Sequence, residues 1–149
     1  MITFKMRMPM GDEVTFKYAD GSQKILNNFT LREFMQRDGK VDFVRMDSVI
    51  LTAIQQIRNH FGKPVIITSA YRSKKYNRKI GGVRNSAHTL GKAIDFKVIG
   101  VSIKEVRQYI KHNFGWLGIK GLGIYRTFNH IDCKDRNKTT LALWHGRGL

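Results

Sequence analysis

The sequence predicts an α+β fold in a single domain, with a mainly antiparallel sheet flanked by helices. Three observations lead to this class. Apolar residues alternate at period two over residues 3–18, the spacing of half-buried strands. Residues 46–61 carry apolar side chains at helical spacing. Short apolar runs at 65–69 and 93–98 are typical of buried strands. A length of 149 residues fits one domain with a sizeable core.

The chain is expected to begin with a hairpin-like extension over residues 1–27, followed by the core of the domain over residues 28–149. Within the extension, two alternating runs are separated by Met10-Gly11-Asp12, which is typical of a turn between paired strands. At the start of the core, Thr30 is followed three residues later by Glu33. This spacing is a capping box and predicts a short helix.

The clearest helix is predicted over Met46–Phe61, because apolar residues recur there at steps of four, three and four. Asp47 is the expected N-cap, and Gly62-Lys63-Pro64 ends the helix. Val65–Ser69 follows as a short buried strand. The apolar face of the helix consists of Ile50, Ile54, Ile57 and Phe61.

In the second half of the chain, further strands and one long helix are expected. Lys75–Arg78 reads as one helical turn in a basic loop. Ser102 is the expected N-cap of a helix that runs to Phe114. The predicted strands are residues 93–98, 121–125, 128–133 and 141–144.

The net charge is a strong bulk signal. The 27 lysines and arginines outnumber the 11 acidic residues, which gives +16 at pH 7. Such a charge attracts polyanions, including nucleic acid, anionic lipid and the anionic polymers of a bacterial envelope. The basic residues are scattered and form no recognised nucleic-acid motif. We therefore expect anionic envelope polymers, rather than nucleic acid, to meet the basic surface.

The remaining composition bears on location and assembly. The longest apolar stretches are about six residues, which is too short for a membrane span. The N-terminus lacks the apolar core of a signal peptide, so we expect synthesis in a cytoplasm without a secretion signal. Cys133 is the only cysteine, which excludes an intramolecular disulfide. We expect a monomer.

Two histidines and one aspartate form a candidate metal site. His88 and Asp95 lie seven residues apart with Gly91 between them, and His130 lies in a later strand-like segment. Two imidazoles and one carboxylate suit Zn²⁺ and leave a fourth position for water, as in a catalytic site. These residues predict a zinc hydrolase.

Two blocks of sequence resemble the M15 family of zinc D,D-peptidases, in its D-alanyl-D-alanine carboxypeptidase-like branch. The resemblance spans about Asn28 to Asp132 and implies the fold that this family shares with the hedgehog signalling domain. It also implies that His88, Asp95 and His130 are the zinc ligands. The blocks are Ser69-Ala70-Tyr71-Arg72-Ser73 with Asn77, Ile80-Gly81-Gly82 and Ser86-x-His88-x-x-Gly91-x-Ala93-x-Asp95, and Gly121-x-Gly123-x-Tyr125-x-x-Phe128-x-His130-x-Asp132.

The resemblance also implies roles beside the metal. Arg72 would bind the substrate and stabilise the oxyanion, because a fixed guanidinium can donate two hydrogen bonds to developing charge. Ser86 would hold a substrate carbonyl or carboxylate through its hydroxyl group.

The general base is where the sequence departs from the family. Many relatives carry Glu, Asp or His three residues before the last zinc histidine, and this chain has Thr127 there. Asp132 lies two residues after His130, so both side chains face the same side of a strand. Asp132 could take the proton as the base or orient a ligand imidazole. His145 is a further candidate for the base.

These observations predict a zinc metallopeptidase that hydrolyses peptidoglycan stem peptides, as a D,D-carboxypeptidase or an endopeptidase. The scissile bond stays open between D-Ala-D-Ala, L-Ala-D-Glu and a cross-bridge. Small size and strong positive charge favour a phage lysis enzyme or a virion-associated enzyme that acts on the cell wall. Two alternatives remain, namely an inactive zinc-binding structural or interaction module on the same fold, and a basic nucleic-acid-binding protein.

Overall fold

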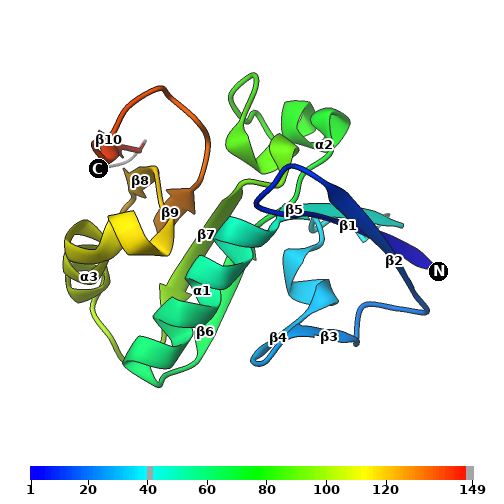
Figure 1. Ribbon diagram of the computed structural model, residues 1–149, viewed down its shortest axis with the longest axis horizontal. Helices are drawn as coiled ribbons and strands as arrows, with labels where there is room; N and C mark the ends of the chain where they lie inside the picture. The colour runs from blue at the N-terminus through cyan, green and yellow to red at the C-terminus, as the bar shows by residue number, and fades with distance from the viewer. Residues whose placement is uncertain (40–41, 147–149) are drawn as a thin grey trace.

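The computed structural model describes residues 1–39 and 42–146. These residues form a single α+β domain, as predicted, and its elements are three sheets and three α-helices (Figure 1). The strands are β1 (Ile2–Arg7), β2 (Glu13–Tyr18), β3 (Lys24–Leu26), β4 (Phe29–Thr30), β5 (Phe43–Asp47), β6 (Val65–Ser69), β7 (Ala93–Val98), β8 (Gly121–Ile124), β9 (Asn129–Asp132) and β10 (Ala142–His145). The helices are α1 (Ser48–Phe61), α2 (Lys74–Lys79) and α3 (Ile103–Leu117), with the 3₁₀ turns η1 (Leu31–Phe34) and η2 (Ala87–Leu90).

The largest sheet has five strands in the order β10-β8-β9-β7-β6. Adjacent strands of this sheet are antiparallel, except for β8 and β10, which are parallel to each other. The mainly antiparallel sheet expected from the sequence is therefore present. In β7 and β9, Asp95 lies opposite His130, so the two side chains share one face of the sheet.

Helices α1 and α3 pack against β7 and against each other (Figure 1). Ile94 and Phe96 of β7 are fully buried in the core that α1 and α3 also enter. Because side chains alternate along a strand, Asp95 points to the opposite face. The apolar core and the polar site thus lie on two faces of one strand.

A second sheet, in the order β2-β1-β5, contains the predicted N-terminal hairpin. Strand β1 pairs in parallel with β5, and its residue Phe4 is fully buried in the common core. Residues 1–27 are therefore attached to the rest of the domain by strand pairing as well as by side-chain packing.

Strand β5 was not expected from the sequence, because Met46 continues the helical periodicity of the residues after it. In the structure Met46 pairs with β1, and α1 begins only at Ser48. Asp47 is the N-cap as predicted, since its Oδ1 accepts a 2.9 Å hydrogen bond from the Val49 amide.

Other predicted helix ends agree with the structure or differ from it by a few residues. The Thr30 amide donates a 2.7 Å hydrogen bond to Glu33, which is the acidic half of the expected capping box. Helix α3 starts after Ser102 as predicted but continues to Leu117, where Gly118 ends it with φ of 74°. No helix in the described ranges combines the length and apolarity that crossing a bilayer requires.

Candidate metal centre

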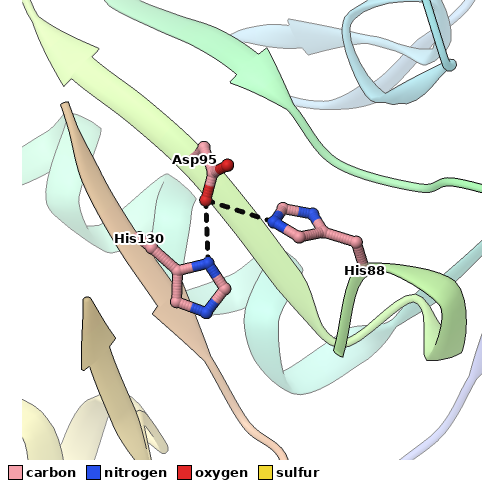
Figure 2. A group of neighbouring side chains, drawn as sticks. All are labelled: His88, Asp95 and His130. Atoms are coloured by element: carbon pink, nitrogen blue, oxygen red, sulfur yellow. Dashed lines mark hydrogen bonds and ion pairs between the residues drawn. The ribbon is translucent and has the colours of Figure 1, made fainter. Parts of the chain in front are cut away.

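His88, Asp95 and His130 converge from three separate elements, η2, β7 and β9 (Figure 2). One potential ligand atom from each lies within 4.8 Å of the other two, and all three residues are buried. The strand pairing places Asp95 beside His130. His88 reaches them from η2, which ends at Gly91 with φ of 71°.

Each imidazole directs one nitrogen toward Asp95 and has the other held by a fixed partner. His88 Nδ1 donates to the Ala70 carbonyl at 2.7 Å, while its Nε2 lies 3.2 Å from Asp95 Oδ1. His130 Nδ1 lies 2.8 Å from the same oxygen, and its Nε2 lies 2.8 Å from Asp132 Oδ2. The ring orientations are thus set by groups outside the trio.

This donor set fits a zinc ion. Ligands about 2.0–2.1 Å from Zn²⁺ in a tetrahedron are about 3.3–3.4 Å apart, close to the 2.8 and 3.2 Å separations from Asp95 Oδ1 to the two nitrogens. Two neutral imidazole nitrogens and one carboxylate oxygen also match the ligand chemistry of zinc.

The charges around the trio are strongly coupled. Burial opposes ionisation of Asp95, but the charge of His88 and hydrogen bonds from both imidazoles outweigh it, so the pKa of Asp95 is well below its usual value. Burial likewise opposes protonation of His130, yet its hydrogen bonds to Asp132 and Asp95 raise its pKa to about 9. Without a metal, a proton on the His130 ring therefore compensates the buried carboxylate charge.

Tight packing fixes η2, which carries His88. A Cβ atom at Gly91 would lie 2.2 Å from the Arg45 carbonyl oxygen. The Asp47 amide donates to the Gly91 carbonyl at 2.8 Å, which joins the end of η2 to the end of β5. Buried Ser86 caps the other end, because its hydroxyl oxygen accepts from the His88 amide at 3.2 Å.

Arg72 lies beside the trio with its guanidinium held on two sides. Its Nε donates to Ser69 Oγ at 3.0 Å, and its Nη1 donates to Asn77 Oδ1 at 3.1 Å. The remaining nitrogen, Nη2, is 3.8 Å from Asp95 Oδ2. A Cβ atom at Gly82 would come within 2.0 Å of Asn77 Oδ1, so the glycine makes room for this support.

Asp132 is fully buried and has both oxygens engaged. Arg136 binds it in a two-pronged ion pair, with Nη1 at 2.7 Å from Oδ1 and Nη2 at 3.0 Å from Oδ2. Hydrogen bonds from His130 and Arg136 overcome the opposing effect of burial and lower the pKa of Asp132 to about 2. The carboxylate therefore stays ionised while it orients His130.

The Trp144 indole completes this arrangement. Its ring lies 5.2 Å from the His130 ring, and the Arg136 guanidinium lies over it at 5.3 Å. No local sequence pattern separates Arg136 from the other basic residues, so its place in the site was not predicted. Only the fold brings Asp132, Arg136 and Trp144 together.

The trio lines a cleft of about 510 Å³ that also contains the other predicted site residues. Arg72, Ser86 and Asp132 line it together with the metal trio, and His145 of β10 lies in its wall. Aromatic side chains form part of the remaining lining, namely Tyr125, Phe128 and Trp144.

Comparison with known proteins agrees with this geometry. The family described as Peptidase M15 matches residues 27–134, which contain every predicted site residue except His145. The chain belongs to the M15 peptidase family. M15 peptidases are metallopeptidases, and His88, Asp95 and His130 form a group that can hold a metal ion in this member.

Curated relatives include Peptidoglycan L,D-endopeptidase MepK of Escherichia coli strain K12 and the protein of the same name in Shigella flexneri. Each is 25% identical to this M15 chain over 132 residues. The match covers 82% of this chain and 70% of the relative.

Proposed function

We propose that this M15 protein is a zinc-dependent peptidase that hydrolyses the stem peptides of bacterial peptidoglycan. The observation that carries the proposal is the convergence of His88, Asp95 and His130 in a cleft beside Arg72. Membership of a metallopeptidase family supports the reaction class. The MepK relatives, which are named for peptidoglycan, support the substrate class.

The trio would hold the metal through His88 Nε2, an Asp95 oxygen and His130 Nδ1. When bound, Zn²⁺ supplies Lewis-acid polarisation of the scissile carbonyl and lowers the pKa of a water molecule toward neutrality. The protein contributes by keeping the three donors in one place, since the outer nitrogens of both rings are already bonded to Ala70 and Asp132.

Arg72 would stabilise the negative charge that develops on the carbonyl oxygen during attack. Ser69 and Asn77 hold its guanidinium, which leaves Nη2 directed toward the centre. A donor that is fixed before the reaction needs no reorganisation in the transition state. Ser86 Oγ accepts from the His88 amide, and its hydroxyl proton can be donated to a substrate carbonyl.

For Asp132 we propose the orienting role rather than the base. Both of its oxygens already accept charged or imidazole hydrogen bonds, and its side chain is sealed from solvent. A group with these partners serves to fix the His130 ring and its tautomer. Asp132 is therefore a positioning residue.

The bond that we expect to be cleaved is an L,D linkage within the stem peptide, by an endopeptidase, because the named relatives are L,D-endopeptidases. The test is digestion of purified peptidoglycan followed by mass spectrometry of the soluble fragments. The proposal predicts new amino termini at one type of L,D bond and none after chelation of zinc. A non-catalytic zinc-binding module on this fold would release no new termini with or without zinc.

A further inference from the structure

A second hollow of about 600 Å³ lies beside the candidate metal centre. It forms where the β1–β2 hairpin, β5, the start of α2, η2 and the segment after β9 meet. We refer to it as the basic groove. Its lining residues are Arg7, Glu13, Arg45, Lys74, Thr89, Leu90, Lys92, Lys134 and Asp135.

Five of these residues are cations and two are carboxylates. Glu13 is paired with Arg45 at 2.7 Å, and Asp135 lies 3.9 Å from Lys120 outside the lining. Arg7 and Lys74 are exposed and form no ion pair within 4.0 Å with any residue that the structure describes. The groove therefore carries an uncompensated positive charge that would attract an anionic ligand.

The basic groove adjoins the cleft of the metal centre. Lys134 lines both hollows, and its Nζ donates to the Asn85 carbonyl at 3.2 Å on the cleft side. Thr89 and Leu90 line the groove, whereas His88, the preceding residue of η2, lines the cleft. Consecutive residues of η2 thus line the two hollows.

We propose that the basic groove is a subsite for free carboxylates of an acidic peptide substrate. The inference rests on the proposed peptidase function and adds the chemistry by which the substrate is recognised away from the scissile bond. The position of the groove next to the cleft favours a ligand that is part of the substrate. None of the lining residues is aromatic, so the groove lacks the stacking platform typical of single-stranded nucleic-acid binding.

The test compares two double variants with the same loss of charge. Arg7→Gln with Lys74→Gln removes two exposed cations of the groove that form no ion pair with any residue that the structure describes. Lys104→Gln with Lys111→Gln removes two exposed cations of α3, which lies away from the β1–β2 hairpin and α2 (Figure 1) and contributes no residue to the groove lining. Each protein is assayed on an acidic stem peptide and on the same peptide with its side carboxylates amidated.

The proposal predicts that the groove variant raises KM for the acidic peptide about tenfold and leaves kcat within about twofold. KM for the amidated peptide should not change, and the α3 variant should match the wild type on both peptides. Equal effects of the two variants would overturn the proposal, because they would show a response to net charge alone. An unchanged KM in the groove variant would overturn it as well.

Fluorescence anisotropy measures the binding of a labelled acidic stem peptide to the full chain. This measurement separates the inference from the function on which it rests. If the wild type cleaves neither peptide, the proposed function fails, and the anisotropy alone decides the groove. Weaker binding only in the groove variant supports the subsite. If that variant loses affinity for a short labelled DNA and keeps its affinity for the peptide, the groove is a nucleic-acid site and the proposal is wrong.

Discussion

Among single residues, Asp132 shows how the surroundings of a carboxylate select its role. Its position two residues after His130 is compatible with a general base or with an orienting partner. Its bonds to His130 and Arg136 use both oxygens, and its side chain is almost fully buried in the wall of the cleft. The two roles make different predictions for zinc binding, because only the orienting role acts through a metal ligand.

Replacement of Asp132 by Asn should weaken zinc binding about 10–100-fold, since the amide cannot hold the His130 ring as the ionised carboxylate does. A competition titration against a chromogenic chelator measures the affinity. Asp135→Asn is the matched control, because it changes an exposed carboxylate three residues away. Unchanged zinc affinity together with lost turnover would instead identify Asp132 as the base.

Arg72→Lys should lower kcat/KM about a hundredfold while the protein still binds one zinc per chain. A lysine keeps the charge but cannot bond Ser69 and Asn77 while it also points at the substrate. Steady-state kinetics and metal analysis on the same preparation check both parts. Turnover equal to that of the wild type would remove Arg72 from the reaction.

Cys133 should be almost unreactive in the folded protein. Burial, with the nearby charge of Asp47, raises the pKa of its thiol to about 12, so at pH 8 nearly all of it is the protonated, unreactive form. Ellman's reagent should modify the native protein about three orders of magnitude more slowly than the urea-unfolded chain. Comparable rates would show that the end of β9 opens readily.

At the level of elements, η2 and its terminal glycine place His88. Gly91→Ala should destabilise the fold by about 3 kcal/mol or more, because a side chain there is strained at φ of 71° and collides with the Arg45 carbonyl. Gly100→Ala is the matched control, with φ of 79° and no atom within 4 Å of the added carbon, and should cost about 1–2 kcal/mol. Urea unfolding measures both, and equal costs would contradict the role of this contact.

The elements that sequence periodicity predicted well are those with a local signal. The hairpin alternates through Phe4 and Phe16, and α1 has an N-cap at Asp47 and a stop at Gly62. Strand β5 has no such signal, since Met46 fits both a strand and the helix that follows. Its pairing with β1 joins residues about forty positions apart, and only the folded chain shows this contact.

The candidate site likewise has one part that the sequence predicts and one part that it does not. His88, Asp95 and His130 stand at spacings that are recognisable in the sequence, and strand register explains why two of them meet. The support around them depends on contacts that residues outside the trio make with Arg72 and Asp132. Asn77 holds Arg72 from α2, and Arg136 reaches Asp132 from the segment after β9. Asn77 and Arg72 belong to one block of the family resemblance, but no spacing in that block indicates their contact, and Arg136 belongs to neither block.

Across the whole molecule, function is separated from stability by the two faces of the large sheet. Helices α1 and α3 cover one face of this sheet, and the polar side chains around Asp95 lie on the other face. Two further features lie on the side of η2, namely the cleft with Arg72 and the basic groove with Lys134. This layout allows the site to collect buried charges without interrupting the apolar core.

The central claim is that one zinc ion, held by His88, Asp95 and His130, is required for peptide hydrolysis. The most direct measurement is a titration of chelated protein with zinc, in which bound metal and release of peptidoglycan fragments are followed together. We expect hydrolysis to rise in proportion to bound zinc and to stop rising at one zinc per chain. Alanine at any of the three positions should abolish both zinc binding and hydrolysis. Full hydrolysis by the metal-free protein, or stoichiometric zinc retained in all three alanine variants, would contradict it.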